Sequence, residues 1–182
     1  MAQWDEVLDE MFRTRRRALV GYAYLLTGNM HEADDVVQDA FVKTFRRGRR
    51  ANDLPLAEAY VRRAILTIFI DSRRASSRLR DTQVRLVDDP ARASLAPTVD
   101  TRVDVQAALR CLSPRERACV VLRYYDDLTV PEVARRLGMR EGTAKRYLHD
   151  ANAKLARELG PRPGAARPFA PQFPATTTEG AS

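Results

Sequence analysis

The stretch LTVPEVARRLGMREGTAKRYLHDANAKLAR, residues 128–157, carries the clearest structural signal in the chain. Thr129, Pro131 and Glu132 form the start signal of a short helix, because they combine an N-cap, an early proline and a capping-box glutamate. Gly138 ends this helix, since glycine accepts left-handed geometry. A longer basic helix follows the turn. A short helix, a tight turn and a long helix together predict a helix-turn-helix.

The long helix of this motif has two different faces. Apolar residues that share one face are expected to pack on the domain core, and they are Ala144, Leu148, Ala151 and Leu155. The residues that point away from that core are Lys145, Arg146, His149 and Asn152. Cationic and amide side chains of this kind reach phosphates and base edges in a major groove. The alternative is a solvated basic face on an ordinary helical hairpin, but the capping signals and the short turn favour DNA binding.

Helical periodicity extends over most of the remaining chain. It predicts helices that end near Gly28, cover about 30–47 and about 56–79, and resume near residue 101. The first helix is expected to bury a stripe of Leu8, Met11, Phe12, Leu19, Tyr22 and Leu26. Ser113 and Glu116 form a second capping box. We therefore expect an all-α fold.

The periodicity also divides the chain. It disappears between residues 81 and 100, which we expect to be a flexible linker between two small helical domains, 1–80 and 101–160. Residues 161–182 are rich in proline, alanine and threonine, and this composition predicts a disordered tail.

Charge is distributed unevenly over a chain whose formal net charge is +7. The helix expected at 30–47 starts with acidic residues and ends with basic ones, an order that the helix macrodipole explains in part. The basic stretch then continues beyond this helix through Arg62, Arg63, Arg73, Arg74, Arg78 and Arg80. An acidic patch beside a strongly basic one indicates two partners, one of them nucleic acid. Tyr60 lies among these arginines. An aromatic residue in this position can stack on an unpaired base, but we favour the alternative that Tyr60 packs in the core.

Several classes of protein find no support in the sequence. Cys111 and Cys119 lie in an apolar helical pattern and are expected to be reduced core residues, not a zinc site or disulfide framework. His31 and His149 have no metal-ligand spacing, and no nucleophile elbow or phosphate loop occurs, so we expect no enzyme, metal or cofactor. The N-terminus lacks the order of a signal peptide, and no apolar run reaches about 20 residues, so we expect a cytoplasmic protein without membrane insertion.

Three segments together resemble the extracytoplasmic-function (ECF) sigma factors, the smallest class of the sigma-70 family, and in particular a small actinobacterial subgroup. EADDVVQDAFVKTFRR at 32–47 resembles the second conserved region, AYVRRAILTIFIDSRR at 59–74 the promoter-recognition helix that follows, and 112–155 the fourth region. The resemblance covers about residues 8–158. It implies a subunit that binds core RNA polymerase and directs promoter-specific transcription initiation.

The resemblance also implies roles for individual residues. The polymerase β′ clamp coiled coil would contact Asp34, Asp35, Gln38 and Asp39. The −10 element of promoter DNA would contact Arg49, Arg50, Asn52, Tyr60, Arg63, Thr67, Arg73 and Arg74. The −35 element would contact Arg140, Thr143, Lys145, Arg146 and His149, while the same domain packs on the β flap. Many relatives are held inactive by an anti-sigma factor, and nothing in the sequence shows whether this chain has one.

Some positions depart from the pattern of the family. Thr67 stands where an asparagine that contacts a flipped base is common, and Tyr60 stands where tryptophan is usual. Arg140 occupies the usual position of a serine N-cap, and Arg146 replaces a serine. These differences affect the expected promoter sequence and not the class. The alternative function is a helix-turn-helix regulator that binds operators, which would need a phosphoacceptor or ligand-binding domain upstream; the helical first domain supplies neither.

Overall fold

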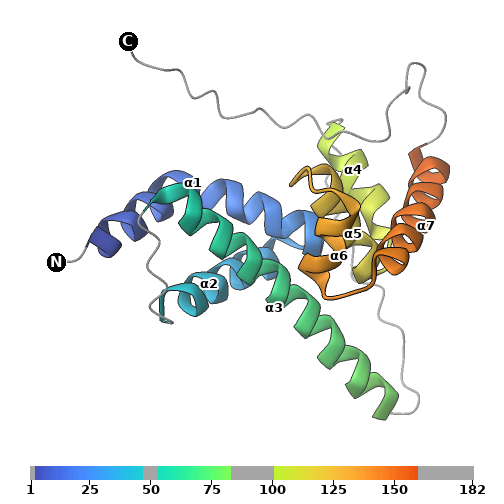
Figure 1. Ribbon diagram of the computed structural model, residues 1–182, viewed down its shortest axis with the longest axis horizontal. Helices are drawn as coiled ribbons and strands as arrows, with labels where there is room; N and C mark the ends of the chain where they lie inside the picture. The colour runs from blue at the N-terminus through green and yellow to red at the C-terminus, as the bar shows by residue number, and fades with distance from the viewer. Residues whose placement is uncertain (1–2, 47–52, 83–100, 160–182) are drawn as a thin grey trace. The chain divides into compact units, whose positions relative to one another are not determined.

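The computed structural model describes residues 3–46, 53–82 and 101–159, and these segments contain helices and no strand (Figure 1). The helices are α1 (Gln3–Thr27), α2 (Met30–Arg46), α3 (Leu54–Thr82), α4 (Thr101–Arg110), α5 (Pro114–Tyr124), α6 (Val130–Leu137) and α7 (Glu141–Leu159). The all-α prediction is confirmed. The expected linker lies almost wholly outside the described residues, as does the tail, so the predicted domain boundaries stay predictions.

Helix α3 is longer than the periodicity predicts, and it begins before Pro55. The side chain of Asp53 accepts a hydrogen bond from the Leu56 backbone N–H at 2.8 Å, so Asp53 acts as the N-cap. Pro55 then lies in the first turn, where a backbone N–H would lack an intrahelical acceptor in any case. The proline therefore belongs to the start of the helix and not to the break before it.

By its internal contacts the chain divides into two compact units, Met1–Ala118 and Cys119–Ser182. In the first unit, α1, α2 and α3 all contact one another. Their core is formed by apolar side chains from all three helices, among them Met11, Leu19, Tyr22, Leu26, Val37, Val61, Ile65 and Phe69.

Two sequence-based expectations about burial are wrong. Phe12 is 54% exposed, and its ring packs edge-on against that of Phe41 at the rim of the helices. Met11 is fully buried instead, so the inward direction of α1 at this turn passes through Met11 and not through Phe12. Cys111 is exposed, and its thiol donates to the Ala108 carbonyl at 2.9 Å, whereas Cys119 is buried as expected.

The second unit contains the predicted helix-turn-helix, in which α6 contacts α7. The expected inner face of α7 is confirmed, and the buried residues of the two helices are Val133, Ala134, Ala144, Leu148, Ala151 and Leu155. Gly138 has φ 62° and ψ 42°, the left-handed conformation that an L side chain adopts at a cost. The Met139 N–H reaches back to the Ala134 carbonyl at 3.0 Å, so the turn closes as a Schellman motif.

Candidate nucleic-acid and polymerase interfaces

The start of α6 is held by its capping glutamate. The Glu132 carboxylate accepts from the Thr129 backbone N–H at 2.7 Å and from the Thr129 hydroxyl at 2.5 Å. These hydrogen bonds stabilise the ionised carboxylate and hold the pKa of Glu132 below its usual value, with the side-chain bond the larger cause. The hydrogen bonds of Glu132 thus fix the point at which the chain enters the helix-turn-helix.

The outer face of α7 is cationic. Lys145, Arg146 and His149 are exposed, as predicted for DNA-reading residues, while Thr143 is half-buried. Lys145 pairs with Glu141 at 3.0 Å one turn earlier, in an exposed ion pair. The Arg146 guanidinium lies 5.7 Å from the centre of the Tyr147 ring. Neither contact buries its cation, so both side chains remain able to reach a nucleic acid.

Arg140 and Asn152 differ from the other predicted residues of the helix-turn-helix. Arg140, expected as a −35 contact, precedes α7 and is exposed. Its backbone carbonyl accepts from the N–H groups of Thr143 and Ala144, whereas its side chain has no acceptor atom and cannot cap the helix. Asn152 does not point away from the core as expected. It is hydrogen-bonded to the Tyr124 hydroxyl, with oxygens 3.3 Å apart and the amide nitrogen 3.1 Å from the hydroxyl. Asn152 therefore ties α7 to α5, a pairing that sequence periodicity could not reveal.

An acidic face lies on α2. Asp35, Gln38 and Asp39 are exposed and, at spacings of three and four residues, lie on one side of the helix. Asp34 differs, because it pairs with Arg16 of α1 at 2.8 Å. The four residues predicted to contact polymerase therefore separate into an exposed group of three and one that joins two helices.

A shallow groove continues this acidic face toward α3. Its lining consists of Asp39, Val42, Lys43, Arg46 and Ile68. Val42 is 52% exposed, so an apolar side chain lies among charged ones. Val42 and Ile68 are not among the contact residues expected from the sequence, although Val42 could have been found as the apolar residue on the polar face of its helix.

The cationic face of α3 is smaller than the arginine count suggests. Arg63, Thr67 and Arg74 are exposed, and Tyr60 is half-buried. The Thr67 hydroxyl donates to the Arg63 carbonyl at 2.8 Å, so at rest it is occupied within its own helix. The predicted −10 residues Arg49, Arg50 and Asn52 lie outside the described residues.

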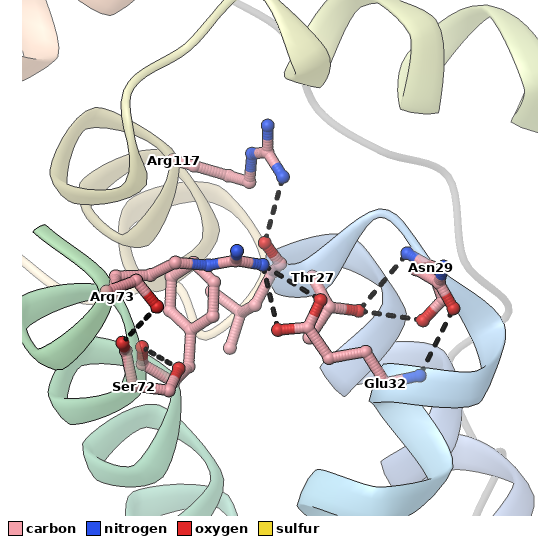
Figure 2. Close-up of polar contacts among 9 residues, drawn as sticks. Thr27, Asn29, Glu32, Ser72, Arg73 and Arg117 are labelled. Atoms are coloured by element: carbon pink, nitrogen blue, oxygen red, sulfur yellow. Dashed lines mark hydrogen bonds and ion pairs between the residues drawn. The ribbon is translucent and has the colours of Figure 1, made fainter. Parts of the chain in front are cut away.

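Two arginines of the basic stretch expected from the sequence stabilise the fold of the first unit through ion pairs. Arg73 donates to both carboxylate oxygens of Glu32 at 2.8 and 2.9 Å, and its guanidinium lies 5.4 Å from the centre of the Phe69 ring (Figure 2). Arg62 pairs with Glu58 at 2.7 Å and lies over the Tyr22 ring. Both residues are satisfied by partners within the first unit, which the count of basic residues could not show.

The described residues thus form an acidic face on α2, a cationic strip on α3 and a cationic outer face on α7, the long helix of the helix-turn-helix. Among the described residues, no cluster of three or more His, Cys, Asp or Glu could hold a metal ion. In the same part of the chain, no helix combines the length and apolarity needed to cross a bilayer.

Comparison with known proteins accounts for this combination. The family model described as "Sigma-70 region 2" matches residues 11–79, and the one described as "Sigma-70, region 4" matches residues 102–155. The chain is 34% identical over 156 residues to the RNA polymerase sigma-E factor of Streptomyces coelicolor, covering 85% of this chain and 88% of that protein. The chain belongs to the sigma-70 family. The match to both regions favours a sigma factor over the alternative function, a helix-turn-helix regulator that binds operators.

Further relatives place this sigma factor in the ECF class. The ECF RNA polymerase sigma factor SigM of Mycobacterium tuberculosis strain H37Rv is 31% identical over 153 residues, covering 84% of this chain and 76% of the relative. The fold resembles that of the sigma factor RpoE from Bartonella quintana, solved with the anti-sigma factor NepR, with a TM-score of 0.55 over 79% of this chain and 90% of that one at 22% identity. As an ECF sigma factor, the protein binds core RNA polymerase and directs promoter-specific initiation. Initiation factors of this kind act without catalysing a reaction themselves.

Proposed function

We propose that this sigma factor divides its task among three surfaces: α2 binds core polymerase, α3 with the loop before it engages the −10 element, and α7 reads the −35 element. The observation that carries the proposal is the exposed row of Asp35, Gln38 and Asp39 on α2. It is opposite in sign to the cationic faces of α3 and α7, so one chain offers complementary surfaces to a protein partner and to DNA.

The polymerase partner of α2 is the β′ clamp coiled coil. A helical partner can lay its side chains along the exposed face of α2, with Val42 and Ile68 as apolar contacts and Asp39 as a charged one. Carboxylates set the orientation of such a complex, and the two apolar side chains of the groove supply burial. The second unit packs on the β flap while it holds DNA.

The −10 element is engaged through Arg63, Thr67 and Arg74, with Tyr60 at the beginning of the strip. Arg49, Arg50 and Asn52, which precede α3 in the sequence, complete this set. Exposed arginines contact the backbone, and a base that leaves the stack is read in a protein pocket. Because Arg73 is bonded to Glu32, we assign it to the support of α3 and no longer to direct DNA contact.

The −35 element lies in a major groove against α7. Lys145, Arg146 and His149 face the DNA, and Arg140 and Thr143 lie at the start of the helix, which is the end that enters the groove in helix-turn-helix proteins. The protein works in the cytoplasm, where polymerase and chromosome are, and it needs no cofactor and catalyses no reaction. An anti-sigma factor, such as the one bound by the Bartonella protein, is a further partner.

The test is run-off transcription and core-polymerase pull-down with the double variant Asp35→Lys/Asp39→Lys. Loss of a charge pair that is buried in a complex costs about 2–5 kcal/mol, so we expect binding to fall by about 30-fold or more. The matched control is Glu6→Lys/Glu10→Lys, which makes the same change of charge at two exposed positions with the same spacing on α1. Equal binding by both folded variants would remove α2 from the polymerase interface.

A further inference from the structure

An acidic side chain lies within the cationic outer face of α7. Asp150 follows Arg146 by four residues and His149 follows it by three, so the three side chains are neighbours on the surface of the helix. Arg146 and His149 are exposed, and Asp150 is half-buried. The proposed function gives roles to Arg146 and His149 but none to the carboxylate of Asp150.

Among the residues that the structure describes, Asp150 forms no ion pair. Opposite charges four residues apart on a helix can pair, but the Arg146 guanidinium lies 5.7 Å from the centre of the Tyr147 ring instead. Glu141 in the first turn of α7 behaves differently, because it pairs with Lys145 at 3.0 Å. The acceptor oxygens of Asp150 are therefore available to a group outside the protein.

A carboxylate on a DNA-reading face has few favourable partners. DNA phosphates repel it, and the hydrogen-bond donors of the major groove are the N4 amine of cytosine and the N6 amine of adenine. Adenine places its N7 acceptor beside that amine, and this nitrogen repels a carboxylate, whereas cytosine has a C–H group in the corresponding place. A carboxylate in the major groove therefore favours cytosine.

The helix sets the distance between Asp150 and Arg146. Four residues rise about 6 Å and stacked base pairs are about 3.4 Å apart, so the two side chains lie against positions about two base pairs apart. We propose that Asp150 reads a cytosine in the −35 element about two base pairs from the base that Arg146 contacts, and that its charge rejects sequences without an amine donor there. This specificity rests on the proposed assignment of α7 to the −35 element.

The experiment measures how polymerase reconstituted with each variant binds a library of −35 sequences. Asp150→Ala should abolish a preference for cytosine at one position, a preference of about five- to 150-fold over the other bases. It should also raise the affinity for the remaining sequences, because a negative charge near the phosphates is removed. Asp150→Asn keeps the size of the side chain, and its amide both donates and accepts, so this variant should accept adenine at the same position.

The matched control is Glu158→Ala, which removes the same charge from an exposed position about two turns further along α7 and should leave the base preference unchanged at every position. An equal rise in affinity for all sequences with Asp150→Ala, with no position relaxed, would overturn base reading by Asp150. Weaker binding to core polymerase with an unchanged base profile would place Asp150 at a protein contact and overturn it equally. A parent protein without any −35 preference would refute the assignment of α7 itself, so the two failures are distinguishable.

Discussion

Replacing Lys145 and Arg146 of α7 separately by alanine distinguishes two kinds of DNA contact. The side chain of Lys145 is 65% exposed, and among the described residues its ion-pair partner is Glu141 at 3.0 Å. Exposed ion pairs of this spacing contribute about 0.3–0.5 kcal/mol, so it costs little to move the ammonium group of Lys145 from Glu141 to a DNA phosphate. One phosphate contact contributes about 0.9 to the logarithmic salt slope. Lys145→Ala should therefore lower that slope by about 0.9 for every promoter, without changing the order of preference.

Arg146 is suited to a guanine edge, because its planar fork donates two parallel hydrogen bonds. Such a contact contributes about 1–3 kcal/mol of discrimination against a wrong base. Its position over the Tyr147 ring is an exposed cation–π contact worth about 0.5–1 kcal/mol, and Arg146 gives this up when it reaches the base. About 0.5–2 kcal/mol remains, which is about two- to thirtyfold in relative affinity. Arg146→Ala should relax specificity by that factor at a single −35 position.

The assay is binding of polymerase reconstituted with each variant to a library of −35 sequences at several salt concentrations. Each variant is the control for the other, because both remove one positive charge from neighbouring positions of the same helix. A uniform loss for Arg146→Ala across the library, with no position relaxed, would refute base reading by Arg146 and leave it as a phosphate contact.

Two further predictions concern Thr67 and Glu132. Thr67→Asn, which puts a larger amide on the exposed face of α3, should shift the preferred base within the −10 element in transcription from randomised promoters; identical base profiles would show that Thr67 does not contact that base. Because the folded state lowers the pKa of Glu132, this residue contributes stability above its ordinary pKa and loses that contribution as pH falls through the lowered value. Thermal unfolding should therefore show Glu132→Gln less stable than the parent at neutral pH, with a difference that shrinks in acid; a difference independent of pH would contradict the capping role.

The sequence by itself was sufficient for the helices, the helix-turn-helix and the class of protein. Local chemistry decides these features, and it is written in adjacent residues: Gly138 must end α6, Glu132 must cap it, and the apolar positions of α7 recur at helical spacing. The exposed carboxylates of α2 follow from the same periodicity. The motifs that resemble sigma factors are likewise continuous segments.

Only the tertiary structure decided which charged and polar side chains are free to act. Periodicity assigns a residue to a face of its helix, but it does not show which other helix supplies a partner. Arg73 meets Glu32, Asp34 meets Arg16, and Asn152 meets Tyr124, each across a separation of 18 residues or more. The bond from Arg117 to Leu26 spans 91 residues. Such pairs form because folding brings distant segments within about 3 Å of one another, and that proximity has no signature in either segment alone.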